Sequence, residues 1–470
     1  MKKTKVKVLG LLLAITMVFT IIPVWAIGNN GGDINYTELQ PGGIDLITWG
    51  RELIIDQFGL EFWQNYERTN TYIDMIWASF PQTRTGERVY PSYFGGFYID
   101  DDGNLNVLLV DTVATMELSA NAEYMAGLET IRGLDTGINV RYVEFSYADI
   151  WAKFHSIGAF MDDNLGSRTA NNISGWYIDL INNRIGVTLV DLSYDQVAHF
   201  RSEISDSLLI VLYECQGISY HIDVPEHDFE TVVSENSGLF VDDVGERNMP
   251  TSLQPSLQPG QRLYDANGEF MGSAGYRIRR FTIPTTTNAF VVSGHVVLDD
   301  QRVYNRNRVL LGIGSSRRIH YDSTILILES NVLTSNIPYG LTWVSELVPR
   351  VRNSVVGQTA VMLGGETGLP IRSGRIVYLG AALVPRGGFT IFATLATYCS
   401  AEGDSGGIVW NPGTGEVLGI HSGRREVPRT ATESGGCQCG NCHGARDNWA
   451  AGFSPAGPIN RANGTIWNMH

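Results

Sequence analysis

The sequence predicts two regions of different fold class, an α+β region in the first half of the chain and an all-β domain in the second, with a boundary near residue 252. The second half contains short β-branched runs separated by glycine-rich turns, and few helical windows. Many short strands of this kind predict a β-sandwich or β-barrel. In the first half, hairpin patterns are followed by stretches with helical periodicity, which indicates α+β structure.

Charge divides the chain at the same place. From Leu253 onward there are 19 Arg, no Lys and 14 acidic residues, a net charge of +5, which leaves 15 basic and 35 acidic residues, or −20, in residues 1–252. Two halves of opposite charge attract each other if they fold together. The basic half has no dense Lys/Arg stripe, so we expect no nucleic-acid partner.

Residues 1–26 have the layout of a secretory signal peptide. Four lysines between Lys2 and Lys7 precede an apolar stretch over residues 8–24, which ends at Val24-Trp25-Ala26. We therefore expect a secreted, extracellular protein without membrane association once this segment is removed. The alternative is a retained membrane anchor, for which the apolar stretch is near the lower length limit.

The region at residues 27–252 contains a degenerate internal repeat. Residues 96–100 and 107–111 flank one polar turn, and residues 175–179 and 187–191 flank another, as in β-hairpins. Each hairpin is followed by a helix-like stretch, at about 113–131 and 193–204, and then by a short strand such as 208–213. We predict two hairpin-helix modules, at about 95–160 and 173–225, after a more helical segment at 46–80.

The domain at residues 253–470 is predicted to be built from short strands. Their apolar runs lie at residues 289–292, 324–328, 359–363, 376–379, 390–394, 408–410 and 417–420.

Ser405 lies in a glycine-rich turn, Glu402-Gly403-Asp404-Ser405-Gly406-Gly407. The glycines allow a tight turn that exposes the Ser405 hydroxyl and directs the amides of Gly403 and Ser405 at one point, where an oxyanion could bind. A glycine-rich turn with serine is common, so this signal alone is weak.

Two further residues could complete a catalytic set. His295 follows the apolar run Phe290-Val291-Val292, and a neutral imidazole there could accept the serine proton. Asp322 precedes an apolar strand and could orient the imidazole through its Nδ1–H. The competing residues are less suitable: Asp299 and Asp300 are too close to His295 in sequence, and His320 is followed by charged and bulky residues.

The order His295, Asp322, Ser405 resembles the trypsin/chymotrypsin-like serine proteases, in particular the bacterial streptogrisin and α-lytic protease branch. The resemblance extends over about residues 258–425 and includes Thr367-Gly368, Cys399 and the segment 419–423. It implies a catalytic domain of two antiparallel β-barrels, a Ser-His-Asp triad, and an oxyanion hole at Gly403 and Ser405. It also implies a pro-region before residue 253 that assists folding and then blocks the cleft. We expect a monomer that acts on protein or peptide substrates and needs no cofactor.

The sequence departs from that family at several positions. Val296 follows His295 where many members have Cys, and Met362 and Ser373 occupy positions where a second cysteine pair is expected. Leu363 replaces an arginine that pairs with the acid beside the nucleophile. Arg372 is the candidate partner for Asp404.

Five cysteines favour disulfides in an exported protein. Cys215 is alone in the first half, and removal of that half would leave an even set with an open pairing, namely Cys399, Cys437, Cys439 and Cys442. The alternative is zinc bound by the last three with His443. We expect no metal.

Two segments of the sequence indicate which substrate side chain is preferred. No carboxylate occurs in residues 396–401, which disfavours a preference for Lys or Arg. The resemblance implies substrate contacts from Ser400, His421, Ser422 and Gly423, and glutamate-specific members have a histidine at the position of His421. We therefore predict a preference for Glu or Asp before the scissile bond, with a neutral apolar side chain as the alternative.

The resulting hypothesis is a secreted serine endopeptidase made as a precursor and cleaved between about Glu246 and Gly260. The alternative from another functional class is a non-catalytic secreted binding protein with a protease-like fold.

Overall fold

The structure is a computed structural model of the 470-residue chain. It describes residues 44–83, 88–110, 138–214, 254–282, 285–366, 371, 373–383, 391–401, 403–426, 449–462 and 467–468. The predicted signal peptide, the predicted helix at 113–131, Thr367-Gly368, and every cysteine except Cys399 lie outside these residues. Within them, no helix is both long enough and apolar enough to cross a membrane.

The first half begins with the predicted helical segment, which forms α1 (Leu46–Phe58) and α2 (Leu60–Ser79). The Asp45 side chain accepts a hydrogen bond from the Thr48 amide and caps α1. Gly59 separates the two helices with a φ of +91°, in the left-handed region that favours glycine.

The two repeat copies fold alike. In the first, β1 (Phe94–Ile99) and β2 (Leu105–Val110) form an antiparallel hairpin, and β3 (Ile138–Val143) pairs in parallel with β2. In the second, β4 (Ile173–Asp179) and β5 (Arg184–Leu189) form the hairpin, and β6 (Ile210–Glu214) pairs in parallel with β5 after helix α7 (Tyr194–Glu203). Both predicted hairpins are confirmed, as are the helix near 193–204 and the strand after it.

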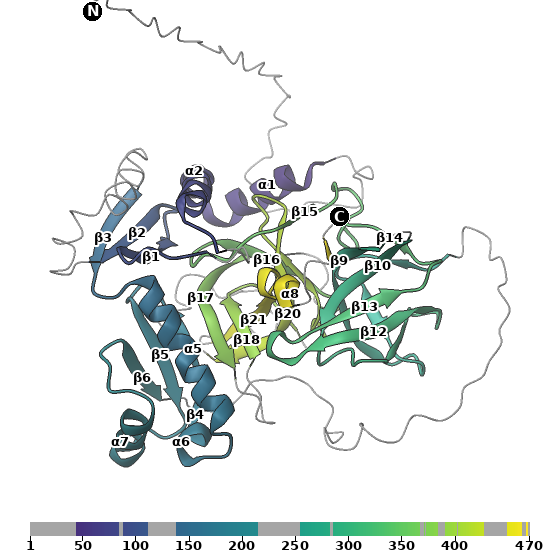
Figure 1. Ribbon diagram of the computed structural model, residues 1–470. Coiled ribbons are helices and arrows are strands. Elements are labelled where there is room, and N and C mark those ends of the chain that lie inside the picture. The colour runs from purple at the N-terminus through teal and green to yellow at the C-terminus, as the bar shows by residue number, and fades with distance from the viewer. Residues whose placement is uncertain are drawn as a thin grey trace, which may run out of the picture. The chain divides into compact units, whose positions relative to one another are not determined.

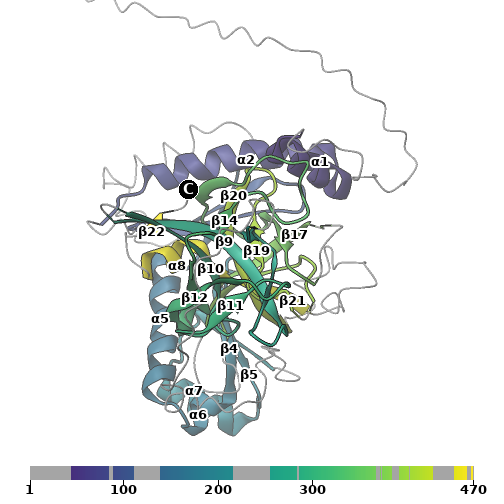
Figure 2. The same cartoon turned by 90° about the vertical axis from the view of Figure 1, so that its right-hand side faces the viewer.

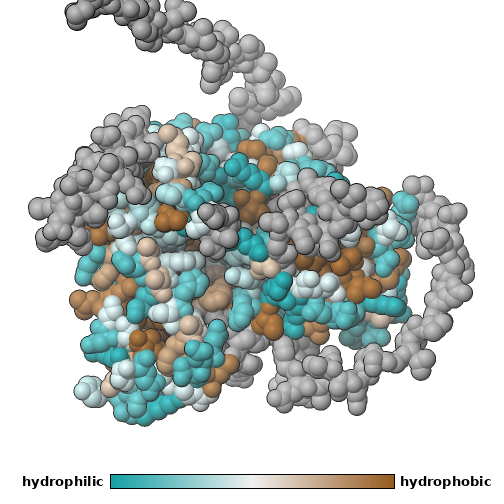
Figure 3. Space-filling view, viewed as in Figure 1, coloured by the Kyte–Doolittle hydropathy of each residue, from teal (hydrophilic) through white to brown (hydrophobic). Residues whose placement is uncertain are grey.

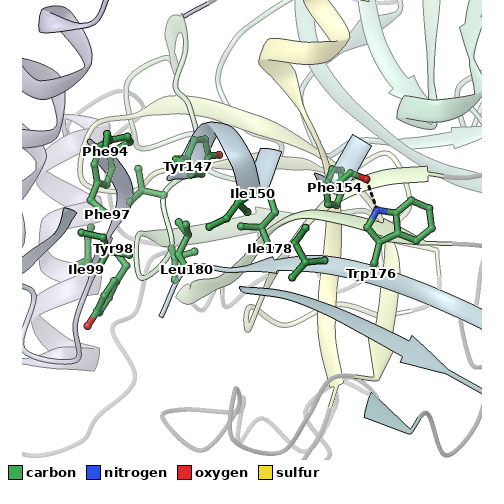
Figure 4. Close-up of a cluster of buried hydrophobic side chains, with 14 of the residues drawn as sticks. Phe94, Phe97, Tyr98, Ile99, Tyr147, Ile150, Phe154, Trp176, Ile178 and Leu180 are labelled. Carbon is green, nitrogen blue, oxygen red and sulfur yellow. Dashed lines mark hydrogen bonds between the residues drawn. The ribbon is translucent and has the colours of Figure 1, made fainter. Parts of the chain in front are cut away.

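Two helices were not predicted: α5 (Tyr147–Asp163), most of which lies within the predicted first module, and α6 (Arg168–Asn172), which lies between the two modules. Ser146 caps α5 by accepting a hydrogen bond from the Asp149 amide, and its buried side chains recur at helical spacing. The helix packs into the core that unites the two modules, where Trp176 Nε1 donates to the Phe154 carbonyl at 3.1 Å (Figure 4).

The second half contains the two predicted antiparallel barrels, each closed by six strands. The first barrel follows the order β10-β13-β12-β11-β8-β9 and closes through β9 and β10. Its strands are β8 (Arg262–Tyr264), β9 (Phe270–Thr282), β10 (Thr285–Ser293), β11 (Arg302–Tyr304), β12 (Leu310–Arg318) and β13 (Ser323–Leu328). Strand β22 (Trp467–Asn468) pairs with β9, and β7 (Ser256–Leu257) pairs in parallel with β14 (Leu333–Thr334).

The second barrel follows the order β16-β19-β20-β21-β18-β17 and closes through β16 and β17. Its strands are β16 (Thr359–Leu363), β17 (Ser373–Leu383), β18 (Ile391–Ala396), β19 (Ile408–Trp410), β20 (Glu416–Glu426) and β21 (Trp449–Pro455). Strand β15 (Val348–Val351) pairs with β20, and α8 (Ala456–Ala462) follows β21. The predicted fold class, a two-barrel domain preceded by an α+β region, is confirmed.

The first half joins the second barrel through backbone and side-chain contacts. Strand β4 pairs antiparallel with β17, so the sheet of the second module continues from the barrel. Helices α1 and α2 lie over the same barrel (Figure 1 and Figure 2), where Tyr66 Oη hydrogen-bonds with Thr359 and Asn411. On the face seen in Figure 3, hydrophobic residues are scattered in small groups among hydrophilic ones, as on most folded proteins.

Candidate active site

His295 and Asp322 are brought together by the pairing of two strand ends. Strand β10 ends at Ser293 and β13 begins at Ser323, and these two residues are partners in the antiparallel ladder. His295 follows the end of β10 and Asp322 precedes the start of β13. The side chains of two residues 27 positions apart in the sequence therefore meet at one edge of the first barrel.

The two side chains form a buried hydrogen-bonded pair. His295 Nδ1 lies 2.8 Å from Asp322 Oδ2 and 3.0 Å from Oδ1, and the His295 amide donates to Oδ1 at 2.9 Å. Their side chains are only 5% and 4% exposed. This geometry holds the imidazole proton on Nδ1, because the carboxylate can only accept, and it leaves Nε2 as the basic nitrogen.

The backbone of Asp322 is itself unusual, with a φ of +40°. A non-glycine residue in the left-handed region carries strain, which the surrounding structure has to compensate. The Asp322 amide donates to the Ile319 carbonyl at 3.0 Å, and the Asp322 carbonyl accepts from the Gly294 amide at 2.9 Å. These two bonds fix the direction in which the carboxylate leaves the chain.

Ser405 lies on the loop between β18 and β19, and glycine is required on both sides of it. Gly403 and Gly406 have φ values of +94° and +89°. A Cβ atom on Gly403 would lie 2.4 Å from the Phe270 ring, and one on Gly406 would lie 2.2 Å from the Ser273 carbonyl oxygen. The glycines therefore allow both the left-handed turn and the close packing against β9.

The amides of this loop fall into two groups. Those of Asp404, Gly406 and Gly407 donate hydrogen bonds to Ala401, His421 and Asp404 carbonyl oxygens, respectively. Among the described residues, the amides of Gly403 and Ser405 donate to none. Unpaired N–H groups beside a serine can hydrogen-bond a negatively charged oxygen, which is the arrangement expected of an oxyanion hole.

The Ser405 loop contacts the barrel edge that holds His295. The Ser273 amide of β9 donates to the Ser405 carbonyl at 2.8 Å, and β9 pairs with β10. A Cβ atom on Gly272 would lie 2.7 Å from the Ser405 carbonyl oxygen and 2.8 Å from the Val296 side chain. In the described part of the chain, Ser405 Oγ and His295 share no hydrogen bond, and such bonds often tighten only when substrate is present.

Asp404, beside the nucleophile candidate, is completely buried. Its Oδ1 accepts from the Glu366 amide at 2.9 Å and its Oδ2 from the Ala401 amide at 2.7 Å. The candidate partner Arg372 lies outside the described residues. Two backbone amides thus stabilise the buried Asp404 carboxylate.

His421 lies on β20 and is 2% exposed. Its Nδ1 is 3.0 Å from the Tyr398 hydroxyl. Burial lowers the pKa of His421 to about 3, with further lowering from His295 and Arg424. The imidazole is therefore neutral over the physiological pH range, and it can donate a hydrogen bond from the ring nitrogen that Tyr398 does not occupy.

The other predicted substrate-binding residues flank His421 and Ser405. Ser400 is buried just before the Ser405 loop, and Gly423 pairs with Gly452 of β21. The Ser422 hydroxyl is buried and lies 2.8 Å from the Ser454 hydroxyl. Any contact of Ser422 with substrate would therefore come from its backbone.

The rejected alternatives lie outside this hydrogen-bonded set. His320 is exposed on a 3-10 turn, Ile319–Tyr321, and Asp299 accepts from the Arg317 amide. Two contributing residues were missed from the sequence, Ser293 and Tyr398. The signals available for them were a serine two positions before His295 and a tyrosine two positions before Ser400.

The predictions about cysteines can be compared with the structure at Cys399, Met362 and Ser373, which are among the described residues. Cys399 is disulfide-bonded, and its partner lies outside the described residues, so the pairing with Cys437, Cys439 or Cys442 stays open. Met362 is buried on β16. The Ser373 hydroxyl donates to Gln57 of α1, a use unrelated to the disulfide for which a family member would have cysteine there.

Comparisons with known proteins found one matching family model and several similar solved structures. Residues 153–213 match the family model described as a Pro-like C-terminal domain. One similar solved structure is Thermobifida fusca protease A, at 19% identity, with 46% of this chain and 100% of that chain covered. Another is Cellulomonas bogoriensis chymotrypsin, at 18% identity, with 46% of this chain and 98% of that chain covered. A glutamic acid-specific serine protease matches at 20% identity, with 46% of this chain and 100% of its own covered. The TM-score is 0.35 for each. No curated protein sequence matches significantly.

The matched segment 153–213 begins within α5 and ends in β6, so it covers most of the predicted second module. The match to a Pro-like domain therefore lies in the first half of the chain, before the two closed barrels.

Proposed function

We propose that the chain is a secreted serine endopeptidase, made as a self-inhibited precursor, in which Ser405 is the nucleophile, His295 the general base and Asp322 the residue that orients the base. The observation that supports this most directly is a buried His295–Asp322 pair next to a serine loop in which two amides donate no hydrogen bond to any described residue. Each half of that arrangement supplies what the other lacks. One moves a proton, and the other stabilises developing negative charge.

The proposed reaction is acyl transfer in two stages. His295 Nε2 accepts the Ser405 proton as Oγ attacks the peptide carbonyl carbon, and the amides of Gly403 and Ser405 hold the resulting oxyanion. His295 then donates that proton to the leaving amine, which breaks the peptide bond and leaves an acyl-enzyme. Water, deprotonated by the same nitrogen, releases the acyl group and restores Ser405. No cofactor takes part in these steps.

A labelling experiment separates this enzyme from a non-catalytic binding protein of the same fold. A fluorophosphonate probe should form an adduct that mass spectrometry maps to Ser405, and both Ser405→Ala and His295→Ala should abolish it, because the base activates the nucleophile. Correctly processed protein that gives no adduct would support the binding protein instead.

The precursor part of the proposal rests on how the first half is attached. Strand β4 extends the sheet of the second barrel, and residues Ile99, Asp100 and Asp101 bind Arg375 of β17. An acidic region held to the basic half in this way fits a pro-region that folds with the protease and is released afterwards.

Cleavage is proposed on the N-terminal side of Pro255, within the window that the sequence gives. From Pro255 onward the backbone is bonded to the segment that follows the first barrel, since the Pro255, Leu257 and Pro259 carbonyls accept from the Leu333, Ser335 and Tyr339 amides. Secretion of the wild type beside Ser405→Ala, followed by N-terminal sequencing, tests this. A mature N-terminus beyond Pro255, or an active protein with the first half still covalently attached, would contradict it.

We further propose a preference for Glu or Asp before the scissile bond. Tyr398 can donate to His421 Nδ1, so that Nε2–H is available to a substrate carboxylate, and Arg424 lies close enough to affect the His421 pKa. A neutral donor with a nearby cation suits an acidic side chain.

A peptide series that varies only the residue before the scissile bond measures this preference. The Glu/Leu ratio of kcat/KM should exceed one in the wild type and fall in Tyr398→Phe, which keeps the ring and removes the hydroxyl that orients His421. Equal cleavage of the Glu and Leu peptides by the wild type would favour the apolar alternative.

A further inference from the structure

Ser293 is the last residue of β10 and is completely buried. It precedes Gly294 and His295, and its ladder partner Ser323 follows Asp322. The position is therefore fixed by the same strand pairing that joins the imidazole to the carboxylate.

The Ser293 hydroxyl contacts both members of the pair. Its Oγ lies 2.6 Å from Asp322 Oδ2 and 2.8 Å from His295 Nδ1. An ionised carboxylate only accepts hydrogen bonds, so the hydroxyl proton is directed to Oδ2. The hydroxyl lone pairs then face the Nδ1–H, which also points to the carboxylate.

Each carboxylate oxygen thus has one donor besides the imidazole. Oδ1 accepts from the His295 amide at 2.9 Å, and Oδ2 accepts from Ser293. Two donors at fixed positions prevent rotation of the carboxylate about its Cβ–Cγ bond. They also present two acceptors, Oδ2 and the Ser293 oxygen, to the proton on Nδ1.

Two other buried serines lie near this pair and do not share the contact. The Ser323 hydroxyl has no hydrogen-bond partner in the described part of the chain, and the Ser422 hydroxyl is bonded to Ser454. Ser323 is therefore a matched control, since it is equally buried and lies directly opposite Ser293 in the ladder.

We propose that Ser293 is a positioning residue that fixes the Asp322 carboxylate and, through it, the Nδ1–H tautomer of His295. The effect of Ser293 on catalysis rests on the function proposed above, whereas its effect on the His295 tautomer does not. Loss of the hydroxyl removes one donor from Oδ2, frees the carboxylate to rotate, and allows the imidazole proton to distribute between its two nitrogens.

The decisive measurement is the tautomer of His295, read from imidazole ¹⁵N chemical shifts in full-length protein labelled with ¹⁵N-histidine. All samples carry Ser405→Ala, which prevents autolysis, and His295→Gln assigns the signals. The parent and Ser323→Ala should show one Nδ1–H tautomer, and Ser293→Ala should show a mixture. An unchanged tautomer in Ser293→Ala would overturn the proposal, whatever the activity of the protein.

Kinetics of the active chain give the second readout. We expect Ser293→Ala to lower kcat about tenfold with little change in KM, the size of one hydrogen bond to a charged group, and Ser323→Ala to match the wild type. A tenfold rise in KM at constant kcat would contradict a role in positioning the base. Absence of any Ser405-dependent activity in the wild type would refute the proposed function and leave the tautomer result to decide the role of Ser293.

Discussion

The two barrels hold their parts of the candidate site in opposite ways. In the first barrel, His295 and Asp322 are buried and joined to each other, to Ser293 and to a backbone amide. In the second barrel, the Ser405 loop leaves two of its amides without acceptors among the described residues. The first arrangement is complete before any ligand arrives, and the second requires one.

The barrels also differ in their support. The hydrogen bonds given above between the first half and the second reach β16, β17 and the segment after β19 of the second barrel, while the first barrel holds its pair with its own strands. We therefore expect changes near the His295–Asp322 pair to affect the reaction with little effect on stability. Changes at the junction with the first half should lower stability with little effect on the reaction.

Asp322→Asn tests the His295–Asp322 pair of the first barrel and should have the largest effect. Asparagine can present an N–H to Nδ1 and stabilise the wrong tautomer, so kcat/KM should fall about 10⁴-fold with a nearly unchanged thermal midpoint. Asp300→Asn, at an exposed acid nearby, is the control. Retention of a tenth or more of the activity in Asp322→Asn would show that the pair is not the catalytic acid–base system.

Gly403→Ala tests the Ser405 loop, in which two amides have no acceptor among the described residues. The new Cβ would lie 2.4 Å from the Phe270 ring, which forces the amide away from its position, so kcat/KM should fall about 10²–10³-fold. Gly268→Ala provides a matched control, because its φ of +84° is equally left-handed but the nearest atom is Nε of the flexible Arg308 side chain, at 3.2 Å. Both variants should lose about 1–2 kcal/mol from backbone strain. Equal activities of the two would count against the oxyanion assignment.

Arg375→Met tests the junction. Arg375 is buried on β17, where burial lowers its pKa, and it donates to the Ile99, Asp100 and Gly357 carbonyls and to Asp101. Methionine leaves those carbonyls unpaired, which should destabilise the Ser405→Ala precursor by roughly 3 kcal/mol in denaturant unfolding. Arg201→Met, at an exposed pair with Asp206, should stay within about 1 kcal/mol of the parent. Equal stability of both variants would refute a supporting role for this contact.

Much of the fold could be predicted because its signals are local. The two hairpin modules and the barrel strands follow from alternating apolar residues and turn residues, and most of the predicted runs lie inside observed strands. The contact between His295 and Asp322 could be predicted because both residues lie at strand ends and because the order His, Asp, Ser in the chain resembles that of the family.

What could not be predicted depends on contacts between distant segments. The pairing of β4 with β17 joins residues about 200 positions apart, and nothing in either strand marks the other as its partner. The orientation of Ser422 toward Ser454, and of Ser293 toward Asp322, is set by which face of a strand meets which neighbour. Helix α5 was a different kind of omission, since Ser146, Asp149 and the apolar spacing after them are a local signal.

His421 compares the same two barrels through the pH dependence of stability. Its pKa is about 3 in the folded protein, because of burial, and about 6.5 in the unfolded chain. Between these values only the unfolded chain binds the proton, so His421 favours unfolding increasingly as the pH falls from about 6.5 toward 3, by up to about 1.4 kcal/mol per pH unit. At higher pH this contribution is absent, because the imidazole is neutral in both states.

Urea unfolding of Ser405→Ala precursors at pH 4, 5, 6 and 7 measures this contribution. In His421→Gln the loss of stability on acidification should be shallower than in the parent, because the residue that takes up the proton on unfolding is gone. His320→Gln removes an exposed histidine of the first barrel and should keep the slope of the parent. Parallel curves for His421→Gln and the parent would mean that His421 has the same pKa in the folded and the unfolded protein, so that it is a cation below about pH 6.5. The neutral-donor account of specificity would then fail below that pH.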